Sequence, residues 1–151
     1  MRTLASAADR EAIVKRISAL SASDRGLWGR MTVDQMVCHL CDSYKIVLGE
    51  KKASPATEYS WPRTIKWIAL RVPVRWPKGT PTRPEVEQGV GGTRPSEFGA
   101  DRAELLATLA RFCGGGIDVA IPHPIFGRMS ASEWLRWGFL HADHHLRQFG
   151  R

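Results

Sequence analysis

The chain has 151 residues, of which 43% are hydrophobic and 25% charged, and its formal net charge at pH 7 is +7. This length suits one domain with a substantial core, and the composition excludes a disordered chain. The first residues lack the unbroken apolar stretch of a signal peptide, and no run approaches the roughly 18 apolar residues that span a membrane. We therefore expect a single cytoplasmic domain over residues 1–151, with no membrane span.

The basic balance, 22 Lys and Arg against 15 Asp and Glu, is compatible with an anionic partner or simply with a solvated basic surface. The three cysteines are an odd number, which argues against a disulfide framework. Cys38 and Cys41 frame His39 in a C-x-x-C pattern, but no second pair completes a structural zinc site. We interpret both as small apolar residues on a helix, with a redox or metal role as the alternative.

The first half of the chain predicts two helices. Residues 6–20 repeat apolar side chains at helical spacing. Thr32 and Gln35 form a capping-box pattern at the start of the second helix, and Gly49 ends it. Between them apolar residues recur at intervals of three and four: Val33, Met36, Val37, Leu40, Tyr44, Val47 and Leu48.

Residues 50–99 differ in character, being rich in Pro, Gly and Thr. Within them Pro62–Arg71 is predicted to form a short helix, with a proline in its first turn and an end before Pro73. From Pro73 to Gly99 we expect an ordered loop, and a loop this long in a compact domain is usually functional or mobile.

Two long helices are predicted in the remainder, Asp101–Phe112 and Ala131–Gln148. Glycines 114–116 end the first, and a capping box between Ser130 and Glu133 begins the second. Four long helices with almost no alternating pattern predict an all-α, four-helix bundle with a long Pro/Gly-rich insertion between its second and third helices.

The last predicted helix carries a stripe that begins with tryptophans and ends with histidines. At about 100° per residue, one face collects Trp134, Trp137, Gly138, His141, His145 and Gln148. His141 and His145 lie one turn apart, about 6 Å along the axis, so their imidazoles can converge on one cation. Neutral imidazole is a common metal ligand, whereas ordinary hydrogen bonding in the core is the alternative.

A third histidine, His39, lies in the middle of the second predicted helix beside Met36 and Leu40. If this helix and the last one are neighbours, His39 closes the site from the opposite wall. Three His ligands with open positions make a catalytic type of site rather than a closed structural one. Ala142 follows His141, which excludes the H-E-x-x-H arrangement of metalloproteases.

Two further histidines are ambiguous. His144 lies about 100° from His145 and is either an alternative ligand or, as we expect, a neighbour of the site or a surface residue. His123, between Pro122 and Pro124, is expected to be a rigid loop residue, with a place in the site as the alternative.

Three polar residues are candidates for supporting the histidines. Gln148 shares their stripe and could orient a ligand or bound water, while Gln35 and Asp42 flank His39 by one turn and could hold its second ring nitrogen. Routine hydrogen bonding between helices is the simpler interpretation of all three.

The string HADHHLRQ at 141–148, together with His39 on an earlier helix, resembles the DinB/YfiT-like superfamily of metalloenzymes. The longer strings HPIFGRMSASEW and HADHHLRQFG are similar to one branch described only as a domain of unknown function. The similarity extends from Trp28 to the C-terminus, through GGTRPSEFGADR. The resemblance implies a four-helix bundle whose histidine triad, here His39, His141 and His145, binds nickel, zinc or a similar divalent ion.

Relatives in that superfamily include thiol transferases and a thiol-dependent isomerase. The resemblance therefore implies a metal-dependent enzyme that activates water or a low-molecular-weight thiol, for thiol transfer or hydrolysis, with a small-molecule partner rather than nucleic acid. A homodimer is left open. Many relatives read H-H-R-x-Q, whereas here Leu146 follows His145, and the insertion is longer than a minimal bundle requires, so the substrate does not transfer.

A non-catalytic binding protein is the alternative. Residues 59–81 interleave tryptophans with Lys and Arg and contain no acid, which suits a membrane surface or single-stranded nucleic acid. On a helix, however, four apolar residues share one face that we expect to pack on the bundle: Trp61, Ile65, Ile68 and Val72.

Overall fold

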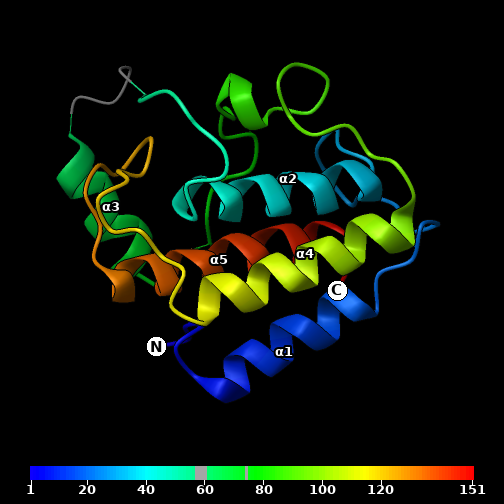
Figure 1. The fold of residues 1–151 in the computed structure, drawn as a ribbon, viewed down its shortest axis with the longest axis horizontal. Helices are drawn as coiled ribbons and strands as arrows, with labels where there is room; N and C mark the ends of the chain where they lie inside the picture. The colour runs from blue at the N-terminus through cyan, green and yellow to red at the C-terminus, as the bar shows by residue number, and fades with distance from the viewer. Residues whose placement is uncertain (57–60, 74) are drawn as a thin grey trace.

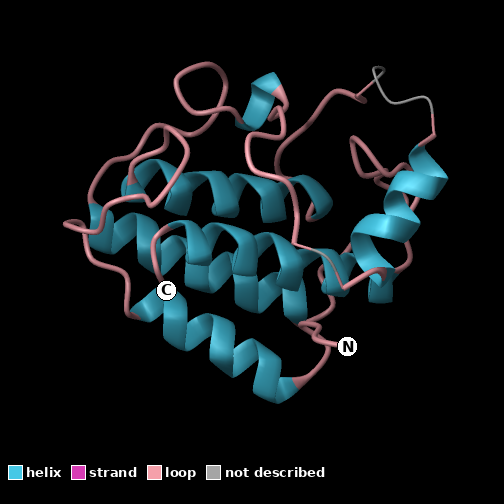
Figure 2. Ribbon diagram, turned by 180° about the vertical axis from the view of Figure 1, so that it is seen from behind, coloured by secondary structure: helices cyan, strands magenta, loops and turns pink. Residues whose placement is uncertain are grey.

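A computed structural model of the chain describes residues 1–56, 61–73 and 75–151 (Figure 1). Its helices are α1 (Ala7–Ser18), α2 (Val33–Val47), α3 (Pro62–Arg71), the 3₁₀ helix η1 (Pro84–Val86), α4 (Phe98–Cys113) and α5 (Ala131–Gln148). The described residues contain no β-strand, and the only strand-like pairing is one antiparallel bridge between His123 and Gly127 (Figure 2). The prediction of an all-α fold is confirmed.

The four long helices α1, α2, α4 and α5 lie alongside one another, and the shorter α3 lies at one end of this bundle (Figure 1). Helix α2 packs against α4 and also contacts α5, whereas α1 contacts both α4 and α5. Because α2 and α5 are neighbours, the histidines of the two helices can meet. In the described part of the chain no helix is both long and apolar enough to cross a membrane.

Local signals explain where the bundle helices begin. Both predicted capping boxes are present: Thr32 pairs with Gln35 at the start of α2, and Ser130 pairs with Glu133 at the start of α5. In each, the hydroxyl accepts from the backbone amide three residues later, and the longer side chain accepts from the capping residue's own amide. These caps fix where α2 and α5 start, and so the positions of the histidines along each helix.

One start was predicted wrongly. Helix α4 begins at Phe98 rather than Asp101, because the Glu97 carboxylate accepts hydrogen bonds from the amides of Gly99 and Ala100. Such a side chain satisfies amides that the first helical turn leaves free. The segment that was expected to be loop up to Gly99 is therefore shorter, and it also contains η1.

The core is centred on Tyr44 of α2. Its ring is fully buried, its centroid is 4.8 Å from that of Phe112 on α4, and its hydroxyl donates a 3.0 Å hydrogen bond to the carbonyl of Gly138 on α5. A Cβ on Gly138 would lie 2.8 Å from the Phe112 ring and 2.9 Å from Leu4, so only glycine permits this approach of helices. The three helices are thus held in a fixed relation next to the histidines.

The insertion between α2 and α4 is fastened to the bundle by Asp42. This carboxylate, 1% exposed, accepts hydrogen bonds from Lys51 Nζ at 2.9 Å and from the backbone amide and hydroxyl of Thr93, both at 2.7 Å. One buried side chain of α2 therefore holds both ends of the insertion. A further hydrogen bond joins two parts of the insertion itself, where the backbone amide of Ser54 donates to the Glu85 carboxylate at 3.0 Å.

Helix α3 does not pack as its pattern predicted. Trp61 is 73% exposed and Ile68 44%, while the buried contact comes from Leu70, which is 2% exposed. Ile65 and Ala69 pack beside Leu70, and α3 rests on the start of α5 through hydrogen bonds such as Arg136 Nε to the Leu70 carbonyl. The predicted apolar face is therefore wrong at Trp61 and Ile68, although Ile65 does pack on the core, because the helix docks through the side that carries Leu70. Tyr59, Ser60 and Val74, which belong to the basic segment 59–81, lie outside the described residues.

Candidate metal centre

Three histidine side chains from two helices converge at one point between α2 and α5. Nε2 of His141 lies 3.3 Å from Nε2 of His39 and 3.1 Å from Nε2 of His145. One ring nitrogen of each histidine lies within 4.8 Å of the other two. The two residues from α5 are one turn apart, and His39 closes the cluster from α2, which is the arrangement that the stripe and the neighbouring helices predicted.

The proton on the His39 ring can be assigned from its partner. Nδ1 of His39 lies 3.1 Å from the carbonyl oxygen of Val86, at the end of η1. A carbonyl oxygen only accepts, so Nδ1 carries the proton and donates it. The Nε2 atom that points into the cluster is then unprotonated and offers a lone pair.

The same reasoning fixes the proton of His145. Nε2 of Gln148 donates a 2.8 Å hydrogen bond to the carbonyl of Trp28, and because that carbonyl only accepts, the amide orientation follows. Oε1 of Gln148 then faces Nδ1 of His145 at 3.0 Å and accepts a hydrogen bond from its N–H. His145 therefore also presents an unprotonated Nε2 to the cluster.

A glycine makes room for the two hydrogen bonds that link Trp28, Gln148 and His145. Gly29 has a φ of +81°, and a Cβ at this position would lie 2.5 Å from Nε2 of Gln148. Positive φ disfavours other residues, and the close approach leaves no space for a side chain. The loop before α2 thus comes near enough for the Trp28 carbonyl to hold Gln148.

His141 is the member without a supporting partner. Its Nδ1 is buried and has no hydrogen-bond partner among the described residues. Its ring packs against Trp137, with centroids 4.8 Å apart. Its orientation is therefore set by packing and by the other two histidines, rather than by a hydrogen bond to its second nitrogen.

Burial keeps the three rings neutral. Desolvation lowers the pKa of His39, and it lowers the pKa of His141 and His145 well below the ordinary value of 6.5. For His141 the positive charge that its two neighbours would carry lowers the pKa further. All three imidazoles are then in the unprotonated state that metal ions require at neutral pH.

The residues present fit a divalent cation. Tetrahedral zinc with bonds of about 2.0–2.1 Å places its nitrogen ligands about 3.3 Å apart, close to the separations of His141 Nε2 from His39 Nε2 and from His145 Nε2. Two lone pairs directed at a third ring nitrogen repel unless a proton or a cation lies between them. The arrangement can thus hold a metal through three nitrogens and leave further positions open.

The supporting roles differ in part from those expected. Gln148 contacts His145, but neither Gln35 nor Asp42 holds the second nitrogen of His39, which was only one of the two interpretations that the sequence allowed for them. Gln35 completes the capping box with Thr32, and the Asp42 carboxylate is occupied by Lys51 and Thr93. Both lie one helical turn from His39, but their side chains are engaged at the helix start and at the insertion.

The remaining two histidines lie outside the three-nitrogen cluster. The ring of His144 is 5.2 Å from that of His145 and packs by its edge against Trp28 at 6.2 Å. His123 is buried at the bridge to Gly127, and its Nδ1 accepts hydrogen bonds from the amides of Ile125 at 3.1 Å and Phe126 at 3.2 Å. His123 thus organises a turn, as a rigid loop residue should.

Two backbone groups that complete the site, the carbonyls of Val86 and Trp28, were missed from sequence. Carbonyls occur in every residue, so no residue type indicates them. The glycine at 29 was the one available signal, because it permits the approach of a loop. Cys38 and Cys41 are buried and free, and burial raises the pKa of both thiols, in agreement with an apolar role.

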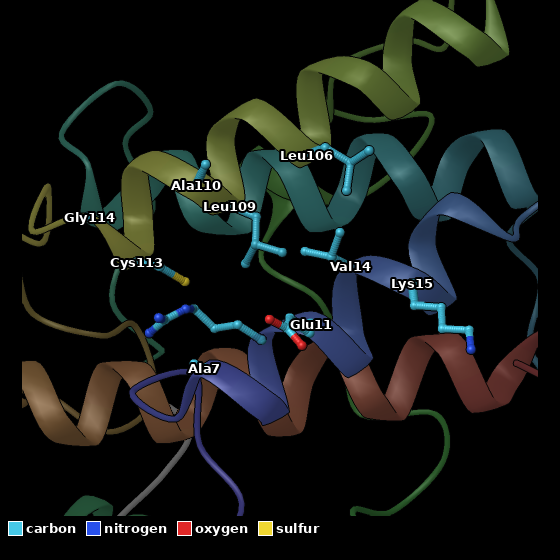
Figure 3. Close-up of a pocket in the computed structure, with 10 residues that line it drawn as sticks. Ala7, Glu11, Val14, Lys15, Leu106, Leu109, Ala110, Cys113 and Gly114 are labelled. Carbon is cyan, nitrogen blue, oxygen red and sulfur yellow. The ribbon is translucent and has the colours of Figure 1, made fainter.

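The surface of the described residues includes a small pocket and a larger groove. A pocket of about 280 Å³ lies beside the histidines and is lined by Trp28, Arg75, Trp76, Lys78, His144 and Arg147. A larger groove of about 540 Å³ lies between α1 and α4, where Val14, Leu109 and Cys113 face it (Figure 3). Neither hollow is lined by a residue of the cluster, but the smaller pocket is lined by His144, whose ring is 5.2 Å from that of His145, so it is the one that lies next to the cluster.

Comparison with known proteins agrees with the fold and the cluster. The family model described as DinB superfamily matches residues 7–149. The chain therefore belongs to the DinB superfamily. Searches of curated proteins and of solved structures found no significant match.

Proposed function

We propose that this chain is a metal-dependent enzyme in which His39, His141 and His145 hold one divalent ion, nickel or zinc, that activates water or a thiol. The observation that carries the proposal is the convergence of three Nε2 atoms, two of which are fixed as lone-pair donors by hydrogen bonds on the far side of their rings. Membership of the DinB superfamily supports it.

When bound, a divalent ion with three neutral histidine ligands acts as a Lewis acid that lowers the pKa of a water or thiol toward neutrality. The chain's own residues supply the rest. Val86 and Gln148 hold two imidazoles in the tautomer that coordinates, and hydrogen bonding to the second nitrogen makes each imidazole a better donor. Trp137 and Trp76 cover His141 with ring centroids 4.8 and 6.3 Å away, which limits the access of bulk water.

The metal content of the purified protein tests the proposal. We expect about one divalent ion per chain in the wild type and a large loss in His39→Ala and His145→Ala, because two nitrogens hold such an ion far less tightly than three. His123→Asn is the matched control, since this buried histidine lies outside the cluster and should leave the metal content unchanged. Equal metal content in all four proteins would disprove the assignment of ligands.

Catalysis is tested separately. Turnover of a low-molecular-weight thiol with an electrophile, or hydrolysis of an activated ester, should fall on chelation and return on addition of nickel or zinc. Turnover that never responds to metal would refute the enzymatic part of the proposal while leaving the metal site in place.

A second candidate function is a binding protein that uses α3. Trp61, Trp67 and Ile68 are 73%, 61% and 44% exposed, an apolar surface beside the basic residues Arg63 and Arg71. Exposed tryptophans among cations suit an anionic membrane surface. Sedimentation with anionic vesicles, in comparison with Trp61→Ser and Trp67→Ser, tests it; the absence of salt-dependent binding would rule it out.

A further inference from the structure

The pocket beside the histidines has an unusual lining for its size. Two indole rings, from Trp28 and Trp76, alternate with three cations, Arg75, Lys78 and Arg147, and no carboxylate lines the pocket. Most of this lining comes from the insertion and from the loop before α2, whereas Arg147 and His144 come from α5. The pocket is therefore a feature that the bundle alone would not provide.

Its positive charge is largely uncompensated. Among the residues that the structure describes, Arg75 and Lys78 have no ion-pair partner, and the Lys78 ammonium lies 4.4 Å above the Trp28 ring. Arg147 pairs through Nε with Asp143 at 2.9 Å, but the same carboxylate also binds Arg16 at 2.7 Å. One carboxylate shared by two guanidinium groups leaves a net positive charge beside the pocket, and a concave positive site concentrates anions.

The pocket and the metal centre share a wall. The Trp76 ring lies 6.3 Å from the rings of both His141, a member of the cluster, and His144, which lines the pocket. His144 is in turn 5.2 Å from His145. A molecule in the pocket would thus lie one aromatic ring away from the cluster.

We propose that this pocket binds a small organic oxyanion, a carboxylate or phosphate attached to a flat apolar group, and that it holds this substrate beside the three-histidine centre. The cations recognise the oxyanion, since guanidinium forks match carboxylate and phosphate oxygens. The two indoles bind the flat group through their faces. The volume of about 280 Å³ limits the ligand to a small molecule. The binding itself needs no metal, whereas the role as substrate rests on the proposed function.

Calorimetric titration of the metal-free protein at low ionic strength tests the binding. The probes are benzoate, phenyl phosphate and the neutral analogue benzyl alcohol. We expect at least one anion to bind about tenfold or more tightly than the alcohol, and comparison of the two anions identifies which oxyanion is preferred. No saturable binding of either anion, or equal affinity for benzyl alcohol, would overturn the inference.

Substitutions locate the site. Arg75→Gln with Lys78→Gln should weaken anion binding about tenfold or more, because it removes the two unpaired cations. Arg94→Gln is the matched control, an exposed arginine outside both the pocket and α3, and should bind the probe like the wild type. Both positions are on the surface, so the variants should fold; if the double variant binds as well as the wild type, the pocket is not the site.

The two proposals fail separately. A protein that binds metal but no oxyanion would overturn this inference and leave the metal centre standing. A protein that binds the oxyanion but no metal would overturn the proposed function and support the pocket. In cobalt-loaded protein, broadening of the fluorine signal of 4-fluorobenzoate would support binding next to the centre, and an unbroadened signal from bound probe would contradict it.

Discussion

Nδ1 of His39 on α2 donates a 3.1 Å hydrogen bond to the carbonyl of Val86, 47 residues further along the chain. The orientation of this histidine therefore depends on the insertion, although the residue itself belongs to the bundle. Val86 is 5% exposed, so no solvent competes for its carbonyl. The hydrogen bonds that hold the insertion in place therefore also keep the ring of His39 in its orientation.

Asp42→Asn should loosen this arrangement. The amide would keep the shape of the carboxylate but lose the charge that binds Lys51 and the strongest hydrogen bonds to Thr93. We expect the free energy of unfolding to fall by about 1–3 kcal/mol, and metal affinity to fall about tenfold or more as Val86 becomes less fixed. Urea denaturation and metal titration measure the two effects.

Glu87→Gln is the control for this change, because Glu87 is an exposed residue next to Val86 whose carboxylate accepts no hydrogen bond from the described residues. It should leave both quantities unchanged. If Asp42→Asn binds metal as tightly as the wild type, the orientation of His39 does not depend on the hydrogen bonds of Asp42 with Lys51 and Thr93.

Two substitutions of Gln148 should separate its two hydrogen bonds. Gln148→Leu removes the acceptor of His145 and the donor to the Trp28 carbonyl, whereas Gln148→Glu keeps an acceptor for His145 and loses only the donor. We expect Gln148→Leu to lower metal affinity about 10–100-fold and Gln148→Glu to lower it less. Competition with a chromophoric chelator gives the affinities. If the two variants bind metal equally, the acceptor at His145 has no influence on the centre.

Gly29→Ala should disturb the same two hydrogen bonds of Gln148, because Gly29 lies against the Gln148 amide. Positive φ makes alanine unfavourable by roughly 1–2 kcal/mol, and its Cβ would also displace Gln148. Gly89→Ala is the matched control, because Gly89 has a φ of +86° with nothing within 4 Å of its added Cβ. Thermal denaturation should show a lower melting temperature in both variants, with the larger decrease in Gly29→Ala. Only Gly29→Ala should weaken metal binding. An equal loss of metal affinity in Gly89→Ala would show that backbone strain, and not the displacement of Gln148, causes the effect.

Acid should destabilise the protein through His123. Burial lowers the pKa of this imidazole from 6.5 to about 3, so below pH 6.5 the unfolded chain binds a proton that the folded chain does not. The resulting stability is complete above pH 6.5 and is lost as the pH falls toward 3, at about 1.4 kcal/mol per pH unit for this group. His123→Asn retains an acceptor for the amides of Ile125 and Phe126 without the titration.

Urea denaturation of metal-free wild type and His123→Asn at pH 7.5, 6 and 5 measures this effect. The gap in stability between the two proteins should shift in favour of the variant as the pH falls. Parallel pH profiles would show that another group causes the acid sensitivity. The three histidines of the cluster contribute to both profiles, so the difference isolates His123.

The helices of the bundle could be predicted from the sequence because their signals are local. The bounds of α3 and α5 agree with the predicted 62–71 and 131–148, since a proline in the first turn and a capping box act within a few residues. The start of α4 was missed because Glu97 caps the helix, and Glu is not among the short side chains Ser, Thr, Asp and Asn that usually occupy this position. The exposed face of α3 was missed because a pattern shows that a helix has an apolar side, not whether a partner covers it.

The convergence of the three histidines was predictable for a related reason. Helical spacing places His141 and His145 on one face, and only the pairing of α2 with α5 had to be assumed. The hydrogen bonds behind the rings were not predictable, because His39 reaches Val86 and Gln148 reaches Trp28 across 47 and 120 residues. Such contacts arise from the tertiary packing of loops, and this packing produces no periodic pattern in the sequence.

Two closures of the insertion, Lys51 and Thr93 on Asp42 and Ser54 on Glu85, hold its ends beside Val86, and the stretch between them, of which residues 55–56, 61–73 and 75–82 are described, packs on α5 through Leu70. Exposed positions of this stretch can therefore be redesigned with the hydrogen bond that His39 donates to the Val86 carbonyl kept. It also carries Arg75, Trp76 and Lys78. These residues, which line the approach to the histidines, and the carbonyl that orients the His39 ring thus belong to separate parts of the insertion, and the two parts can vary independently.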